Sequence, residues 1–502
     1  MPFRRAVLAL AMIFCEAVAL ADIAPRQGDR LPAGFYQRRL KDPTAFTFKR
    51  AYINLARQIR QTRVKMMSAD PDPLEVVKAD AQIAVQGERS IPVLTVLFKN
   101  TPAQPYPAAD LQARLFGPTG DTMTSFYRDN SYGLLTVTGR VENWVKLSQN
   151  DTFYEGADIG GEKCNGVCQN AKLGDMLKDA LDAADKTIDF GQFDNDGPDN
   201  KPNSGDDDGF ADFVAFVHPE MGGECSSPTN RNLWSHRWTY TGWKGAEYPT
   251  QDKTVGGARV KVDDYVIMPA FNCDGTSMIH IGVFAHEFGH AFGLPDLYDT
   301  DAQNGVSQGI GVWCLMASGS WGGDNQSPEL PTHMSAWAKS FLGWVQPQPV
   351  EADRKGAKLE AAHDKRTNAL KIAISANQYY LLEYRPKKGF DAKLPSAGLL
   401  VWRINDTVVN AGLANNRVNA DAANKGVDLV EADALNHLDR ASNAGGNRGD
   451  AGDPYPGSTG NTRLDAKSKP PSQGKAAVCG IAVAADAVTT SAILISTNSC
   501  SP

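Results

Sequence analysis

The chain has 502 residues, of which 42% are hydrophobic and 22% are charged, and its formal net charge is −7. This length accommodates two or three domains, the composition is that of a soluble globular protein, and the acidic balance argues against a nucleic-acid-binding protein. No apolar run reaches about 18 residues, so the sequence predicts no membrane span.

Residues 1–21 have the three parts of a secretory signal peptide. Arg4 and Arg5 form a basic start, AVLALAMIF is a short apolar run, and Ala19-Leu20-Ala21 is a small-x-small cleavage site. We therefore expect an exported, extracellular protein.

Seven cysteines remain once Cys15 leaves with the signal peptide. In an oxidising compartment they can form disulfides, but a sequence does not fix which cysteine pairs with which. The spacing of Cys164 and Cys168 suits either a disulfide or a metal. Two further candidate pairs are Cys225 with Cys273 and Cys479 with Cys500. Cys314 would then remain unpaired, and we expect it to be buried.

Residues 22–89 form a basic leader, with 13 Lys and Arg against 8 Asp and Glu, in front of an acidic body. A basic helical stretch over 44–67 is broken by SADPDP. The charge contrast suggests that the leader is a pro-region attracted to the body, where it assists folding or blocks a cleft. A helix with a solvated basic face and a plain N-terminal extension remain as alternatives.

Residues 90–348 mix strands and helices. A first strand is expected at 90–100, followed in 125–147 by a short helix, a turn at Tyr132-Gly133 and a hairpin strand. Leu173, Met176, Leu177, Ala180, Leu181 and Ala184 form one apolar stripe of a core helix. Later elements are strands at 212–219 and 264–271 and helices at 277–293 and 331–344, the first with Ser277 as N-cap and Gly293 as its C-terminal stop.

Residues 349–502 change to strands and turns, with strands expected at 379–385, 398–404, 427–432 and within 479–497, and with no helix of good period. This pattern indicates a β-sandwich-like C-terminal domain. The predicted fold class is α+β, with domain boundaries at 1–21, 22–89, 90–348 and 349–502.

The stretch AHEFGHAFGLPDLYD, residues 285–299, carries the strongest chemical signal. On a helix, positions i and i+4 share one face, so His286 and His290 can bind one Zn²⁺ while Glu287 accepts a proton from water. Gly293 lets the chain leave the helix in a left-handed turn and return Asp296 as a third ligand. The fourth position stays open, as in a catalytic zinc site.

Several motifs resemble the immune inhibitor A-type secreted metallopeptidases, a metzincin-like group. They are HEFGHAFGLPDLYD, SIPVLTVLFKN, SYGLLTVTGRVENW, LWSHRW, VWCLMASGSW, PTHMSAWAKSFLGWV and GDPYPG, which occur in order over about residues 90–460.

The resemblance implies that His286, His290 and Asp296 bind zinc, that Glu287 is the general base, and that Met316 forms an apolar floor below the metal. Several other metzincins have a tyrosine two residues after this methionine, where this chain has Ser318. The oxyanion-stabilising role therefore stays open among Tyr298, His236 and His333.

The loop DFGQFDNDGPDNKPNSGDDDGFADF, residues 189–213, is crowded with aspartates. Carboxylates interleaved with glycine on a flexible loop are typical of Ca²⁺ sites, although no Glu closes an EF-hand. A solvated acidic loop is the alternative, and the resemblance, which includes calcium-stabilised members, favours structural calcium. The candidate calcium ligands are Asp194, Asp196, Asp199, Asp206, Asp208 and Asp212.

These observations predict a secreted zinc endopeptidase that cleaves protein substrates, bound as extended chains along an edge strand, for which residues 263–271 are the candidate. One alternative is a non-enzymatic surface adhesin with a structural zinc. Another is a thermolysin-like peptidase with Glu329 as third ligand. Asp299 lies further from His290 than Asp296 does, so we expect it to be structural.

Overall fold

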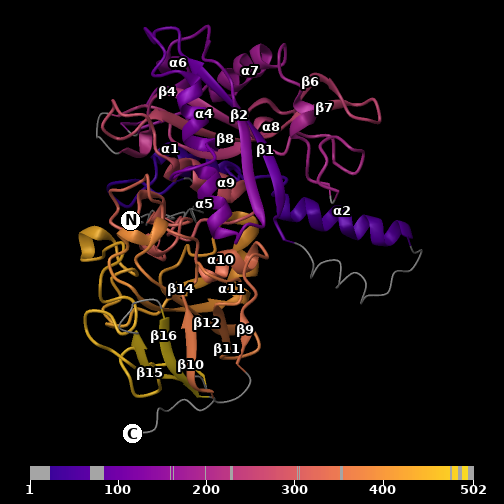
Figure 1. Cartoon of the computed structure of the whole chain (residues 1–502). Coiled ribbons are helices and arrows are strands. Elements are labelled where there is room, and N and C mark those ends of the chain that lie inside the picture. The colour runs from indigo at the N-terminus through magenta and orange to yellow at the C-terminus, as the bar shows by residue number, and fades with distance from the viewer. Residues whose placement is uncertain are drawn as a thin grey trace, which may run out of the picture.

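The computed structural model (Figure 1) describes residues 23–67, 84–158, 160–161, 163–197, 199–225, 230–301, 304, 306–350, 354–474, 477–483 and 489–495. The expected signal peptide and Cys500 lie outside the described residues. Within these ranges, no helix is both long and apolar enough to cross a membrane.

Residues 87–345, which contain the predicted zinc-binding stretch and are called the catalytic region below, are built on a six-stranded sheet. The strand order is β2-β1-β4-β8-β5, and β3 also pairs with β1. All of these pairings are parallel except that of β5 with β8. The bounds are β1 (Gly87–Leu97), β2 (Leu135–Val141), β3 (Val145–Lys146), β4 (Val214–Met221), β5 (His236–Thr239) and β8 (Asp264–Phe271).

The expected hairpin in 125–147 is wrong, since β2 runs parallel to β1. Helices α4 (Ala108–Phe116) and α5 (Met123–Asn130) form the crossover between these strands, as a parallel connection requires. The expected turn is present, because Tyr132 and Gly133 have φ of 56° and 78°.

Residues 263–271 do not form an edge strand either. β8 lies between β4 and β5, and β5 pairs with its first half, from Asp264 to Ile267. The short antiparallel strand β5 therefore forms the edge of the sheet on this side.

Helices cover the sheet. Helix α7 (Leu173–Ala184) buries the predicted apolar stripe. Helix α9 runs from Ile281 to Ala291, so the expected N-cap at Ser277 is wrong: His280 takes that position. The remaining elements of this region are α6 (Asp151–Glu155), α8 (Tyr240–Lys244), α10 (Ala336–Phe341) and the hairpin β6 (Tyr248–Lys253) with β7 (Arg259–Val262).

The C-terminal region contains two sheets. One has the order β14-β13-β12-β11-β9 and the other β10-β16-β15. Buried side chains of both sheets share one cluster that includes Leu359, Leu382, Val401 and Val478. A helix not expected from the sequence, α11 (Asp406–Gly412), follows β13. The strand bounds are β9 (Gln348–Pro349), β10 (Arg354–Glu360), β11 (Ala369–Ala373), β12 (Gln378–Arg385), β13 (Gly398–Asn405), β14 (Val427–Leu429), β15 (Ala477–Val483) and β16 (Thr489–Ile495).

The leader contains α1 (Ala33–Lys41), which the sequence did not predict, and α2 (Tyr52–Met67), whose far end points away from the body in Figure 1. Between the helices the leader lies on the catalytic region. The backbone N–H groups of Lys49 and Arg50 donate to the carboxylate of Asp264, and both side chains pair with Asp263.

Disulfides join Cys164 to Cys168 and Cys225 to Cys273, which confirms two of the three candidate pairs and decides the first in favour of a disulfide. Cys314 is free and buried, as expected. Cys479 is also disulfide-bonded.

Candidate metal centre

Helix α9 carries His286, Glu287 and His290 in the interior, since every residue from Ile281 to Ala291 is buried. Gly289 lies between the two histidines in sequence, and a Cβ there would come within 2.5 Å of the Met316 Sδ. The absence of a side chain at Gly289 therefore lets Met316 pack directly against this part of the helix.

Gly293 ends the helix in a conformation that favours glycine, with φ of +110°. The N–H of Gly293 donates to the carbonyl of His290 at 2.9 Å, and the N–H of Leu294 donates to that of Gly289 at 3.1 Å. The chain then reverses and returns Asp296 to the histidines.

Three ligand atoms converge at this point. The Asp296 Oδ1 lies 3.0 Å from the His286 Nε2 and 3.3 Å from the His290 Nε2, and the two nitrogens are 3.1 Å apart. Ligands about 2.0–2.1 Å from a tetrahedral Zn²⁺ are separated by roughly 3.3–3.4 Å, the edge of that tetrahedron. The observed triangle is close to this size.

The hydrogen bonds of the other ring nitrogens decide what can occupy the triangle. The His286 Nδ1 lies 2.9 Å from the Leu315 carbonyl, and the His290 Nδ1 lies 2.8 Å from the Leu294 carbonyl. With both Nδ1 atoms protonated, each neutral ring directs an Nε2 lone pair at its neighbours. Three acceptor atoms then face one another without a donor, so a metal cation fits this group.

The protonation states of Asp296 and His290 also suit a metal site. Burial would raise the pKa of Asp296, but His290 and His286 hold it well below its usual range. Burial and Arg237 lower the pKa of His290 to about 3, so this ring is neutral, as a metal ligand must be. Burial acts in the same direction on His286, but Asp296 outweighs it and raises the pKa of that ring, so a bound cation would displace a proton there.

Glu287 is fully buried, and both carboxylate oxygens lack a hydrogen-bond partner among the described residues. Burial raises its pKa to about 8, although His286 and Arg237 act in the opposite direction. A carboxyl group poised near neutral pH beside a metal triangle is suited to proton transfer.

Arg237 is a site residue that the sequence analysis missed. It lies on the edge strand β5, and its positive charge acts on both Glu287 and His290. Arg237 and His290 line a pocket of about 280 Å³ together with residues of the leader and of the C-terminal region. The leader residues are Thr47, Phe48, Ala51, Asn54 and Arg57, and the C-terminal residues are Asn410, Leu413 and Ala414. The LWSHRW motif contains this arginine but gave no reason to choose it.

Two of the three residues considered for oxyanion stabilisation have both ring nitrogens engaged by other groups. Both ring nitrogens of His236 are engaged, by the Trp234 carbonyl at 2.7 Å and the Tyr265 hydroxyl at 2.8 Å. His333 belongs to the separate group described below. Tyr298 is buried next to Asp299, outside α9.

The two competing carboxylates are also separate from the triangle. Asp299 accepts the backbone N–H groups of Asp301 and Ser307, each at 2.9 Å, and so shapes its own loop. Glu329 is partly exposed and lies 4.0 Å from His280, at the opposite end of α9 from His290. This placement disfavours the thermolysin-like alternative.

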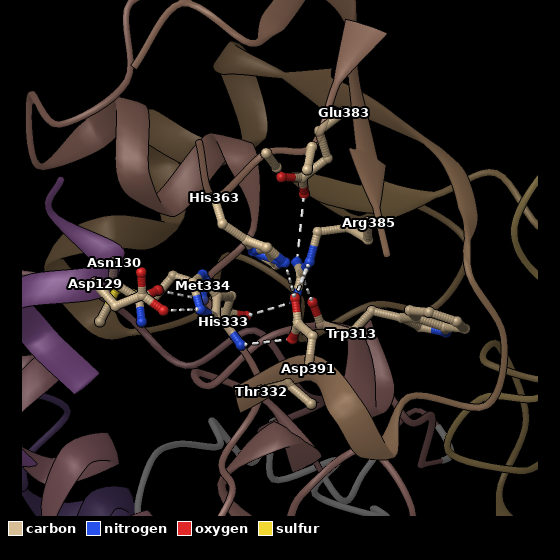
Figure 2. Close-up of polar contacts among 12 residues, drawn as sticks. Asp129, Asn130, Trp313, Thr332, His333, Met334, His363, Glu383, Arg385 and Asp391 are labelled. Atoms are coloured by element: carbon tan, nitrogen blue, oxygen red, sulfur yellow. Dashed lines mark hydrogen bonds and ion pairs between the residues drawn. The ribbon is translucent and has the colours of Figure 1, made fainter. Parts of the chain in front are cut away.

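A second group with metal-type side chains contains His333, His363 and Asp391 (Figure 2). Arg385 occupies both oxygens of Asp391, at 2.6 Å from Nε and 2.5 Å from Nη2. The fixed guanidinium takes the place that a cation would need, so this group is a buried ion-pair network and not a metal centre.

The same network joins the two regions of the chain. The His333 Nε2 lies 3.0 Å from the Asp129 Oδ2 of α5, and the Lys339 Nζ of α10 lies 3.0 Å from the His333 Nδ1. Arg385, on β12, belongs to the C-terminal region. The His333 backbone N–H donates to the Asp391 Oδ1 at 3.0 Å, and Arg385 holds Asp391, so these buried groups fasten the C-terminal region to the catalytic region.

The acidic loop gathers three of its six candidate ligands. Ligand atoms of Asp194, Asp196 and Asp212 lie within 4.8 Å of one another. Asp196 is 2% exposed, and neither of its oxygens has a hydrogen-bond partner among the described residues. Burial and the neighbouring carboxylates raise the pKa of Asp194 to about 9 and that of Asp196 to about 8.

The other candidates take different positions. Asp199 accepts the Lys201 backbone N–H and the Ser204 hydroxyl, and the Ser204 hydroxyl also contacts Asp206. Asp208 lies 3.4 Å from Arg50 of the leader. Asp207, which was not among the predicted ligands, accepts the N–H of Gly197 and acts electrostatically on Asp194. The run of three aspartates at 206–208 gave no means of ranking them.

Comparisons with known proteins agree with the geometry. Residues 109–345 match the model of the immune inhibitor A peptidase M6 catalytic domain. The chain is 34% identical over 236 residues to immune inhibitor A of Bacillus thuringiensis subsp. alesti, covering 44% of this chain and 32% of that protein. It is 28% identical over 282 residues to the pre-pro-metalloprotease PrtV of Vibrio cholerae serotype O1, covering 51% and 29%. The chain thus spans about a third of the length of these relatives.

Proposed function

We propose that this chain, whose residues 109–345 match the peptidase M6 catalytic domain, is a secreted zinc-dependent endopeptidase. The observation that carries the proposal is the triangle of His286, His290 and Asp296 beside the buried Glu287. The relatives named immune inhibitor A and PrtV metalloprotease support the same class of reaction.

In this proposal His286, His290 and Asp296 hold the zinc, which when bound polarises the scissile carbonyl and lowers the pKa of water. Glu287 accepts a proton from the attacking water and delivers it to the leaving amine. Arg237 places a positive charge at the same pocket, where it stabilises negative charge that develops on the carbonyl oxygen. A base next to an incomplete ligand set argues against an adhesin with a purely structural zinc.

The edge strand β5 is the proposed platform for an extended substrate. A peptide that pairs with an exposed strand gains main-chain hydrogen bonds, while its side chains enter neighbouring pockets. Arg237 lies on this strand next to the His290 pocket, so a peptide bound along β5 would pass close to the metal centre.

The leader occupies this platform, which supports its role as a pro-region. Phe46 packs against His236 and Trp238 with ring centroids 5.4 and 5.0 Å apart, and the Arg237 guanidinium lies 5.8 Å from the Phe48 ring. We infer that residues 22–89 block substrate binding until they are cleaved.

For the fold class, we propose that the catalytic region is metzincin-like and that the two C-terminal sheets form a sandwich-like unit.

Calcium is the second proposed metal. Asp194, Asp196 and Asp212 supply the buried oxygens that this hard cation prefers, and a cation would relieve the repulsion among them.

Export is supported by the signal-type sequence of residues 1–21 and by the disulfides in the body.

The direct test is cleavage-site profiling of a proteome by the purified mature protein, with and without a zinc chelator. We expect internal cleavage of proteins that stops on chelation and returns with added Zn²⁺. Zinc binding without any chelator-sensitive cleavage would favour the structural alternative.

A further inference from the structure

The loop that carries Asp296 is held by a segment of the C-terminal region more than 100 residues away. The Asn419 Nδ2 donates to the Leu297 carbonyl at 2.9 Å, and an Arg417 guanidinium nitrogen lies 2.7 Å from the Asp301 carboxylate. The Lys425 Nζ donates to the Gly309 carbonyl at 2.9 Å. The segment 416–425 therefore contacts the chain after Asp296 at Leu297, Asp301 and Gly309.

Asn416 is the member of this segment that touches a candidate metal ligand. Its Nδ2 donates to the Asp296 Oδ2 at 2.6 Å, and its Oδ1 accepts the Asp296 backbone N–H at 2.7 Å. Asn416 is 1% exposed, and its φ of 52° lies in the left-handed region, which asparagine tolerates well. Its carbonyl also accepts the Thr300 hydroxyl at 3.1 Å.

The two oxygens of Asp296 thus have separate tasks. Oδ1 faces both histidine nitrogens, at 3.0 and 3.3 Å, whereas Oδ2 is turned to Asn416. A carboxylate whose second oxygen is fixed by a hydrogen bond offers a cation one oxygen only. This arrangement keeps further coordination positions open, which a catalytic zinc needs and a structural zinc does not.

We propose that Asn416 is a positioning residue for the metal centre and that the C-terminal region thereby completes the site instead of serving as an accessory domain. The inference rests on the proposed function, because it takes Asp296 to be a zinc ligand. The buried network of Figure 2 also holds the C-terminal region against the catalytic region, because the His333 N–H donates to Asp391 while the His333 ring contacts Asp129 of α5 and Lys339 of α10.

The test compares two buried asparagines in the full chain. Asn416→Gly removes both bonds to Asp296 and keeps the left-handed backbone conformation. Asn419→Gly removes a buried asparagine that braces the same loop but does not touch Asp296. Because partners that orient metal ligands typically change affinity 10- to 100-fold, Asn416→Gly should weaken zinc binding by about that factor in a chelator competition. Asn419→Gly should stay within about threefold of the wild type.

Asn416→Asp gives a second readout if the glycine variant does not fold. Once ionised, at a pH above its titration, the introduced aspartate still accepts the Asp296 N–H but no longer donates to Oδ2, so Asp296 is free to coordinate through both oxygens. In the Co²⁺-substituted protein we expect weaker visible absorption, since five-coordinate Co²⁺ absorbs less strongly than tetrahedral Co²⁺. An unchanged spectrum in Asn416→Asp, or equal zinc loss in Asn416→Gly and Asn419→Gly, overturns the role of Asn416.

Asp296→Ala separates this inference from the proposed function. Full zinc affinity in Asp296→Ala would overturn the ligand set on which both proposals rest. Loss of zinc in Asp296→Ala with wild-type zinc affinity in Asn416→Gly would overturn only the positioning role.

Discussion

The Nε2 atoms of His286 and His290 lie 3.1 Å apart, although each Nδ1 is hydrogen-bonded to a backbone carbonyl. Two neutral rings in these tautomers would direct lone pairs at each other and at Asp296. The relationship therefore makes sense around a cation, and it depends on a helix that brings positions i and i+4 onto one face.

Glu287→Gln should reduce peptide hydrolysis by about 100-fold or more, because it removes a general base. Zinc content should stay at the wild-type level, since Glu287 is not part of the ligand triangle. Casein hydrolysis and metal analysis of the same purified sample check both statements. A variant that keeps more than about a tenth of wild-type activity would contradict the assignment of the base.

Arg237→Met should lower kcat more than it raises KM, since a positive charge that acts on the developing oxyanion matters mainly in the transition state. The expected loss in kcat is about 10- to 1000-fold. Lys339→Met, a buried cation outside this pocket, is the control for lost charge. If KM alone changes in Arg237→Met, the residue binds substrate without stabilising the reaction.

Ca²⁺ should raise the melting temperature by several degrees, because a ligand well above its Kd adds a few kcal/mol to the free energy of unfolding. Asp196→Asn should abolish most of this increase, since both oxygens of Asp196 lack other partners among the described residues. The matched control is Asp199→Asn, at an exposed position of the same loop. Melts with calcium and with a calcium-selective chelator decide, and an equal shift in all three proteins would reject the site.

The leader should dissociate from β5 more readily when its ion pairs with the catalytic region are removed. Lys49→Ala with Arg50→Ala deletes the side-chain pairs to Asp263 and the contact to Asp208. We expect faster hydrolysis of a small peptide by the unprocessed double variant, whereas Lys65→Ala, at the exposed far end of α2, should behave as the wild type. N-terminal sequencing must show that the leader is intact in each sample. If the double variant hydrolyses the peptide at the wild-type rate, these contacts do not contribute to inhibition by the leader.

Local patterns predicted the core of the site but not what surrounds it. The spacing of His286 and His290 follows directly from helix geometry, and the glycine at 293 signals the reversal that returns Asp296. The role of Asn416 could not be predicted, because its contact with Asp296 joins positions 120 residues apart. The edge position of β5 was missed for a related reason: the sequence of β8 reads as a strand, but only the pairing of strands distant in sequence shows which one lies at the edge.

Acidification should destabilise the protein through the buried histidines of the network in Figure 2. Burial lowers the pKa of His363 to about 4 and that of His333 well below its usual value, with Lys339 adding to the effect. In the unfolded chain a histidine has a pKa of about 6.5, so the unfolded state binds more protons below that pH. Stability should therefore fall as the pH drops from about 6.5 towards 4.

The slope has an upper limit of about 1.4 kcal/mol per pH unit for each such histidine. Asp391 affects stability only at lower pH, because Arg385 holds its pKa far below the usual value despite its burial. The stability that the ionised Asp391 contributes is lost only as the pH falls through that lowered pKa. Chemical denaturation of the wild type and of His363→Asn between pH 7.5 and 4.5 measures the difference. The variant should lose less stability on acidification than the wild type does. Parallel curves would show that His363 is protonated in the native protein, in spite of its burial beside Arg385 and Lys339.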